Sequence, residues 1–284
     1  GRKDLPLPTS EFEHCIANAK LDGKLYYVEL TNDDNPFGAI YGSNYKAFAL
    51  RINKKENNHP IYLEPETRIT PGSYRKSYIT IEDKNMTVSR ETIRTGGMAS
   101  IIRSSYQDVA DDEIESMLKQ AVGSDFSNIK IEEFNFDENL NNNSDTVTYS
   151  YTFSVDNALQ KIAGFYAFQI PITDNVNPVD IISDPKRKYP VEYWMFDSGK
   201  NYYEEIKIEI PPDLDLLELP DPINHSCFMG DFSLDFKMSG NLLIISRELI
   251  IKEDYVPIEK YEEFSDFFKK VISSDKSQIA FKKK

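Results

Sequence analysis

Apolar and polar residues alternate with a period of two at several places along the chain. The clearest run is 147–155, in which every odd position is apolar or aromatic and every even position is Ser or Thr. Such a strand buries one face. Residues 206–210 and 232–238 alternate in the same way, and the turn at 239–241 leads into another apolar run. Several such strands with turns between them predict a β-sandwich.

Two β-hairpins are predicted from their turns. Residues 12–31 contain two strand-like runs on either side of Asp22-Gly23, a dipeptide that suits a two-residue turn because both central positions need positive φ. Residues 78–89 form a similar pair around the turn at 83–85. We therefore expect one hairpin near the start of the sequence and another after its first quarter.

A period of three to four residues predicts two amphipathic helices. The first begins at Asp111, a favourable cap, and ends at Gly123. The second starts near Pro257, which the first turn of a helix tolerates. The apolar stripes consist of Ile114, Met117, Leu118 and Ala121 in the first helix, and Tyr261, Phe264, Phe268 and Val271 or Ile272 in the second. The predicted fold class is mainly β, of the α+β type, with one or two helices packed on a sheet.

Composition divides the 284 residues into two predicted domains. Residues 53–72 are rich in Asn, Pro, Lys and Glu, a composition that suits a linker better than a core. We place the domain boundary near residue 70, so that residues 1–70 form a small β unit and residues 71–284 form the sandwich. The total length agrees with two domains.

The net charge argues against nucleic acids and anionic membranes as partners. The chain carries 47 acidic and 33 basic residues, for a formal charge of -14, so its surface repels phosphate backbones and anionic membranes. We expect no nucleic-acid partner. No segment reaches the 18 or more apolar residues of a membrane span, so we expect no membrane insertion. The start at Gly1 without Met indicates a processed or engineered end, and the cellular location cannot be read from it.

The few cysteines and histidines do not form a metal motif. Cys15 and Cys227 lie far apart in the sequence, which favours two free thiols over a disulfide. His14, His59 and His225 are also too scattered for a zinc signature. We expect neither a metal nor another cofactor.

The first hairpin brings a histidine and a carboxylate together. A two-residue turn at Asp22-Gly23 places His14 opposite Thr31 and diagonal to Glu29. Residues two apart on a strand share a face, and diagonal neighbours lie about 7–8 Å apart between backbones, so the two side chains can meet. This is the geometry of a general base and the acid that orients it in a catalytic triad.

The same residues resemble a known family. The segments Phe-Glu-His-Cys-Ile-Ala at 12–17, Leu-Asp-Gly-Lys at 21–24, Tyr-Tyr-Val-Glu-Leu-Thr at 26–31 and Asn-Pro-Phe-Gly at 35–38 resemble the end of a bacterial transglutaminase-like (papain-like) core. This resemblance implies that His14 stands at the catalytic His position and Glu29 at the Asp position. It also implies an extracytoplasmic protein, periplasmic or at the cell surface.

The resemblance extends, more loosely, beyond residue 70. Segments 187–191, 203–211 and 258–282 are similar to the uncharacterised β-rich region that follows such cores in bacterial multidomain proteins. The parent protein implied is a transglutaminase-like cysteine peptidase or acyltransferase. This chain would then be its C-terminal part.

The sequence departs from the family's catalytic triad in two ways. The family's nucleophilic Cys comes well before the His, whereas only 13 residues precede His14 here, so we expect that segment to be missing. Cys15 does not replace it, because adjacent strand residues point to opposite faces. Glu29 in place of Asp lengthens the orienting arm by one methylene. His14 and Glu29 are thus interpreted as an incomplete or vestigial triad, the alternative being an ordinary polar strand histidine.

Other candidate sites have simpler interpretations. Tyr193 and Trp194 could stack on a sugar, but aromatic strand residues usually belong to the core. Residues 32–35 offer oxygen ligands for calcium without the spacing of an EF-hand, which favours a solvated turn. His225 and Cys227, in a predicted loop, make a weak metal signal, and the acidic run 213–221 is read as a solvated loop.

The leading hypothesis is a non-catalytic accessory or scaffold region of a transglutaminase-like protein, inactive by itself. Its partners would be the other domains of the parent chain. The alternative is a self-contained β-sandwich that binds a surface glycan or protein through exposed aromatic residues. A third hypothesis, an enzyme that uses Glu29 with Asp33 or Asp34 as acid and base, has no support from their spacing.

Overall fold

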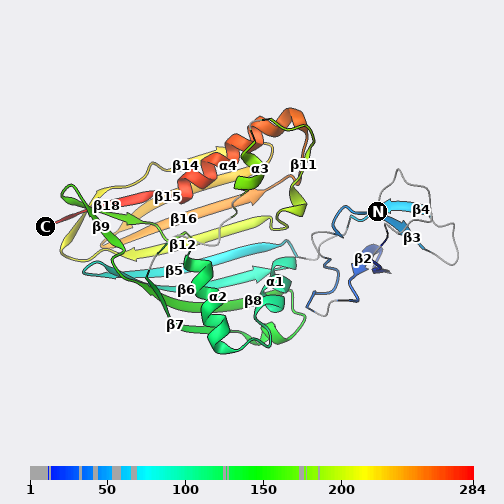
Figure 1. The fold of residues 1–284 in the computed structure, drawn as a ribbon, viewed down its shortest axis with the longest axis horizontal. Helices are drawn as coiled ribbons and strands as arrows, with labels where there is room; N and C mark the ends of the chain where they lie inside the picture. Colours follow the sequence, from blue (N-terminus) through cyan, green and yellow to red (C-terminus); the bar gives the residue numbers. More distant parts are fainter. Residues whose placement is uncertain are drawn as a thin grey trace.

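The computed structural model describes residues 12, 14–31, 34–40, 44–52, 59–64, 69–123, 126, 128–172, 176, 178–184 and 186–284. Its dominant feature is one large mixed sheet, which lies across the centre of Figure 1. Few helices accompany it. The prediction of a mainly β, α+β fold is therefore confirmed.

The large sheet has eight strands in the order β14-β15-β16-β12-β5-β6-β8-β7. Neighbouring strands are antiparallel except β12 and β5, which are parallel. The strands are β5 (Gly72–Glu82), β6 (Asn85–Thr95), β7 (Ile129–Phe136), β8 (Thr146–Val155), β12 (Asn201–Glu209), β14 (Ile223–Ser226), β15 (Gly230–Ser239) and β16 (Leu242–Ile251).

The alternation in the sequence decides which face of this sheet is buried. In β8 the odd positions from Val147 to Val155 are buried and the Ser and Thr positions between them are partly exposed. The same period of two appears in β5, β6, β12 and β16. Because alternate residues of these strands are buried, the sheet has a covered face and an open face.

The covered face packs against helices and a second sheet. α1 (Gly97–Tyr106), α2 (Asp111–Gly123) and α4 (Tyr261–Asp275) contribute to one hydrophobic core with the large sheet. Figure 1 shows α2 and α4 in front of that sheet. The second sheet has the order β13-β18-β10-β9, formed by β9 (Leu159–Ile162), β10 (Phe165–Gln169), β13 (Leu214–Glu218) and β18 (Gln278–Lys283).

Both predicted helices are present, with one difference in the stripes. In α2 the buried side chains are Ile114, Leu118 and Val122, whereas Ala121 is exposed. Ala121 lies one residue off the buried face, which Val122 occupies instead. In α4 the predicted aromatic stripe is buried against the sheet. The helix α1 was not expected from the sequence.

Short elements complete the part of the molecule beyond residue 69. β11 (Val191–Glu192) pairs with β17 (Tyr255–Val256). The other short elements are α3 (Val179–Ile182) and the 3-10 helices η2 (Glu138–Asn141), η3 (Tyr193–Met195) and η4 (Ile258–Lys260). We call residues 69–284 the body.

The described residues from 12 to 64, which we call the hairpin region, form two separate two-stranded sheets. One consists of β1 (Ala17–Leu21) and β2 (Lys24–Val28), and the other of β3 (Phe48–Arg51) and β4 (His59–Tyr62). These strands lie to the right of the body in Figure 1. Apart from Pro36, only Tyr27 and Leu63 among the described apolar side chains of this region are buried.

Part of the predicted linker at 53–72 is ordered as strand. Residues 59–62 form β4, and Gly72 begins β5. The hydrogen-bonded pairing of Phe48–Arg51 with this stretch overrides its linker-like composition. Residues 53–58 and 65–68 lie outside the described residues. The boundary near residue 70 stays a prediction.

Candidate functional site

The first hairpin joins His14 to Glu29. The register of β1 and β2 pairs Leu21 with Lys24 and Ala17 with Val28, as the turn at Asp22-Gly23 predicts. His14 precedes β1 and Glu29 follows β2, and their side chains meet with Nε2 and Oε2 2.7 Å apart. The predicted contact between the two side chains is therefore confirmed, while a catalytic role for them stays a prediction.

The Glu29 carboxylate is buried and well supplied with donors. Thr31 donates to Oε1 through its hydroxyl at 2.8 Å and its backbone N–H at 3.3 Å. Asn44 Nδ2 lies 3.5 Å from Oε2. Burial alone would raise the pKa of Glu29, but the hydrogen bonds from His14 and Thr31 lower it below its ordinary value. Glu29 is thus held as an anion facing His14.

The sequence analysis did not include Thr31 and Asn44 in this site. Thr31 could have been found, because it follows Glu29 by two residues and short-range side-chain bonds to the backbone are common there. Asn44 is 15 residues from Glu29 and lies between β2 and β3, where no periodic pattern places it. Only the folded chain shows that it belongs to the site.

The pairing also orients the imidazole. The contact with Glu29 assigns the imidazole proton of His14 to Nε2. This tautomer leaves a lone pair on Nδ1. No other described residue forms a hydrogen bond to Nδ1. The His14 side chain is 37% exposed, whereas that of Glu29 is fully buried. A buried acid that orients an accessible base is the arrangement from which general-base catalysis starts.

Neither cysteine adds a nucleophile to this pair in the described structure. Cys15 is exposed and free, and its sulfur makes no hydrogen bond to His14. Cys227 lies in the body, where its sulfur accepts a hydrogen bond from the Met229 N–H at 3.3 Å. Burial raises the pKa of the Cys227 thiol, which keeps it protonated and weakly reactive.

Tyr193 and Trp194 do not form an open aromatic platform. Tyr193 is fully buried and stacks on Phe268 with centroids 5.5 Å apart, and burial raises its pKa well above the ordinary value. Trp194 is half-buried and stacks on Tyr255 at 6.4 Å. The Nζ atom of Lys46 lies 5.2 Å from its ring centroid. The core interpretation holds for Tyr193, and the faces of Trp194 have partners within the chain.

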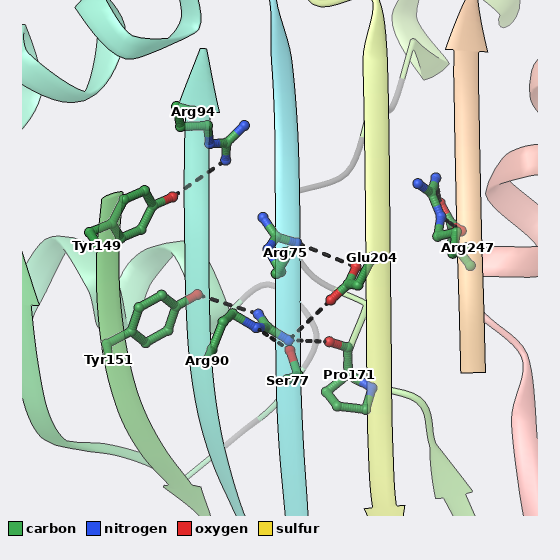
Figure 2. A network of polar contacts seen from close by, with 10 residues as sticks. Arg75, Ser77, Arg90, Arg94, Tyr149, Tyr151, Pro171, Glu204 and Arg247 are labelled. Atoms are coloured by element: carbon green, nitrogen blue, oxygen red, sulfur yellow. Dashed lines mark hydrogen bonds and ion pairs between the residues drawn. The ribbon is translucent and has the colours of Figure 1, made fainter. Parts of the chain in front are cut away.

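A second polar cluster, missed by the sequence analysis, is buried on the covered face of the large sheet (Figure 2). Arg90 of β6 is its centre and is 2% exposed. It donates to Ser77 Oγ at 2.9 Å, to the Tyr151 hydroxyl at 3.3 Å and to the Pro171 carbonyl at 2.6 Å. The guanidinium group therefore joins three strands to the segment that follows β10.

Glu204 of β12 provides a negative charge in this cluster. Its Oε1 lies 3.6 Å from Arg90 and its Oε2 lies 3.5 Å from Arg75 of β5. Figure 2 shows the carboxylate pointing toward both arginines. The sequence signal was available, because Arg75, Arg90 and Glu204 stand in phase with the apolar positions of alternating strands. Charges at such positions are rare unless paired.

The remaining arginines extend the cluster to both sides. Arg94 Nη2 lies 3.5 Å from the Tyr149 hydroxyl. Arg247 of β16 donates two hydrogen bonds to Asp275, at 2.6 and 2.8 Å, and so attaches the end of α4 to the sheet. The cavity beside these groups, lined by Ser73, Arg75, Glu204 and Arg247 among others, measures about 10 Å³. That space is no larger than one water molecule, so the cluster is suited to holding the layers together rather than to binding a ligand.

The open face of the large sheet carries a shallow hollow of about 590 Å³. Its side chains come from β5, β6, β7, β8 and β12 and are mostly polar. They also bond to one another: Lys207 pairs with Glu205 at 2.9 Å, and Thr152 donates to Glu133 at 3.1 Å. Charges of both signs line the hollow, which gives it no preference for an anionic or a cationic ligand.

Comparison with known families identifies part of the body. Residues 166–281 match a domain of unknown function, DUF3858. The match covers less than half of the chain, and a search of curated proteins finds no match at all. Its first and last residues, Tyr166 in β10 and Phe281 in β18, face each other in the second sheet. The two ends of the DUF3858 segment therefore lie side by side, while its strand β12 pairs with β5 outside the segment. No transglutaminase-like family model matches the hairpin region.

Two predictions inside the DUF3858 segment were wrong in local structure. The acidic run 213–221 is not a solvated loop throughout, because residues 214–218 form β13 and pair with β18, with Leu214 buried. His225 lies in β14 rather than in a loop and stacks on Phe267 at 5.8 Å. Pairing with an adjacent strand overrides the Pro and Asp signals around both segments.

Metal sites and membrane-spanning helices can be assessed only in the residues that the structure describes. Asn32 and Asp33 of the 32–35 turn lie outside the described residues. Within the described ranges, no group of three or more His, Cys, Asp or Glu side chains could hold a metal ion. Across the same ranges, no helix combines the length and apolar character that crossing a membrane requires.

Proposed function

We propose that this chain is the C-terminal portion of a transglutaminase-like protein. In this proposal the hairpin region supplies the general base and its orienting acid, and the body serves as a non-catalytic scaffold. The observation that carries the proposal is the 2.7 Å contact between His14 Nε2 and a buried, anionic Glu29. A cysteine from another segment of the intact protein would complete the site.

The geometry suits activation of a thiol. His14 would accept the thiol proton at Nδ1, and the thiolate would attack the acyl carbon of the substrate. The carbon–nitrogen bond would then break, and the imidazolium would return its proton to the departing amine. Glu29 would stabilise the imidazolium that forms, because its carboxylate already accepts the hydrogen bond from Nε2. The longer arm of Glu is accommodated, since the contact distance is that of a strong, charge-assisted hydrogen bond.

Exposed apolar side chains support the assignment of the hairpins to a larger core. Leu30 is 72% exposed and Ile52 is 75% exposed, and Leu21 and Tyr62 are about half exposed. A two-stranded sheet has little stability alone in water and needs another layer to bury its apolar side. The rest of a transglutaminase-like core would provide that layer. The body needs no such addition, because its own core is extensive.

The proposal is tested in the intact protein, with acyl-donor peptides and a primary amine as substrates. We expect thiol-dependent turnover that falls by about 10²- to 10⁴-fold in His14→Ala and by less in Glu29→Gln. Lys207→Met, which changes only the open face of the sheet, is the matched control and should keep full activity. Unchanged turnover in His14→Ala would contradict the catalytic part.

The same assay applied to residues 1–284 tests the scaffold part. We expect no turnover from this chain alone. Thiol-dependent turnover that Cys15→Ala abolishes would refute the proposal, because the chain would then contain its own nucleophile. Turnover that survives both Cys15→Ala and Cys227→Ala would point to chemistry without a thiol.

The hollow on the open face supports a second candidate function, binding of a glycan or protein. Tyr78 is 42% exposed there and its hydroxyl donates to Glu209 at 2.7 Å. A glycan array with the purified chain discriminates between the two functions. Saturable binding lost in Tyr78→Ala but kept in Trp194→Ala would favour a binding module, and a scaffold should give no saturable signal.

A further inference from the structure

The hairpin region meets the body at a small polar contact that neither the family match nor the proposed function explains. The Nζ atom of Lys46 lies 2.5 Å from Asp254 Oδ1, although 208 positions separate the two residues in the sequence. It also lies 5.2 Å from the centroid of the Trp194 ring. One ammonium group therefore meets a carboxylate and an aromatic face, the two groups that bind cations best on a protein surface.

The body holds the two receiving groups rigidly. Asp254 lies between β16 and β17, and its side chain is 12% exposed. Its backbone carbonyl accepts hydrogen bonds from the N–H groups of Tyr193 at 2.8 Å and Trp194 at 3.4 Å. Tyr193 is fixed by its burial in the core, so Trp194 is held beside Asp254. Lys200 lies 3.6 Å from Asp254 Oδ2 and leaves Oδ1 to Lys46.

The hairpin region holds Lys46 equally well. Its backbone N–H donates to the Leu63 carbonyl at 2.7 Å, and Leu63 N–H donates to the Ala47 carbonyl at 3.0 Å. Lys46 has a φ of 54°, an uncommon conformation for a residue other than glycine. Burial alone would lower the pKa of Lys46, but the hydrogen bond and charge of Asp254 raise it. The Lys46 side chain is thus held as a cation against Asp254 of the body.

A second contact lies elsewhere on the same boundary. Arg103 of α1 donates to the Asp34 carbonyl at 3.0 Å. Its other donors are used within the body, on the carbonyls of Asn139 at 3.0 Å, Ser144 and Thr146 at 3.4 Å. These two points of attachment, at Asp34 and at Lys46, restrict how the hairpin region can turn on the body.

We propose that Asp254 and Trp194 form a socket on the body for Lys46, and that this latch docks the hairpin region. The inference is independent of the proposed catalytic role, because it concerns only where the hairpin region is held. Asn44 lies two residues before Lys46 and reaches Glu29. The latch therefore anchors the segment that lines the His14–Glu29 pair.

The single tryptophan of the chain allows a direct test. Lys46→Met keeps the length of the side chain but removes its charge, so Trp194 should become more accessible to acrylamide. In the unmodified chain, added NaCl should weaken the ion pair and raise this quenching, and in Lys46→Met the salt dependence should be lost. Lys46→Arg should keep the low quenching, and Lys207→Met, which removes an ion pair on the open face, should change nothing.

Amide hydrogen exchange provides the second readout. We expect Lys46→Met and Asp254→Asn each to speed exchange at residues 44–52 and 59–64 by about tenfold, with β12 and β16 unchanged. The double variant should be no faster than either single variant, because both remove the same contact. If Asp254→Asn fails to fold, Lys46→Met with its salt series decides alone. Unchanged quenching and exchange in Lys46→Met, or additive effects in the double variant, would overturn the latch.

Discussion

The hairpin region and the body are built from the same local patterns but differ in what they bury. In the body, strands, helices and a second sheet share one core, in which residues such as Phe153, Phe264 and Leu243 are fully buried. In the hairpin region only Tyr27, Pro36 and Leu63 are buried among the described apolar side chains. A correct turn and register are therefore enough to form a hairpin, whereas a stable hairpin requires a second layer that buries its apolar side.

The two regions also use buried charge differently. The body pairs Arg247 with Asp275 and places Glu204 near two arginines, with every partner buried. In the hairpin region the buried Glu29 faces His14, which is partly exposed. A pair with both members buried can only hold structure together, whereas a buried acid with an accessible base can also act on a ligand. This is why we place the candidate chemistry in the hairpin region.

The largest effect is expected from breaking the buried pair of Arg247 and Asp275, which attaches α4 to the large sheet. Asp275→Ala should lower the free energy of unfolding of the body by about 3–5 kcal/mol, because Arg247 is left as a buried, poorly compensated charge. The double variant Arg247→Met, Asp275→Leu should lose less. Urea denaturation followed by circular dichroism measures both. Equal losses in the single and double variants would mean that packing, not charge, matters at this site.

A matched pair of leucine truncations compares the two regions directly. Leu243→Ala in β16 removes a fully buried side chain and should cost about 2–5 kcal/mol of unfolding free energy. Leu30→Ala in the hairpin region removes a side chain that is 72% exposed and should stay within about 0.5 kcal/mol. Denaturant midpoints of the two variants provide the measurement. A large loss in Leu30→Ala would show that the hairpin region has a core of its own.

The smallest expected effect concerns pH. The pKa of Glu29 lies below its ordinary value of 4.5, so its stabilising contribution is fully present above that value and is lost as the pH falls through the lowered pKa. Thr31→Val removes a donor at 2.8 Å and should raise the pKa of Glu29 toward the ordinary value. Carboxyl ¹³C NMR titration measures the change. Thr152→Val in the body is the control, and an unshifted Glu29 in Thr31→Val would contradict the assigned cause.

Much of the fold was predictable because its signals are local. The alternation at 147–155 indicated the buried face of β8, the turn at Asp22-Gly23 fixed the register that joins His14 to Glu29, and the stripe after Pro257 indicated α4. The errors at 213–221 and around His225 share one cause. In both segments strand pairing overrides the turn-forming residues: β13 pairs with the distant β18, and β14 pairs with β15, the next strand along the chain.

The sequence by itself determined the strands, their buried faces and the pairing of His14 with Glu29, because these depend on residues a few positions apart or on a single turn. Only the tertiary structure decided which distant groups meet: Arg75 with Glu204, 129 positions apart, and Lys46 with Asp254. Such contacts depend on the order of strands in a sheet and on how layers stack. Strand order and layer stacking leave no periodic pattern in the sequence. The buried arginine cluster and the latch therefore become visible only in the fold.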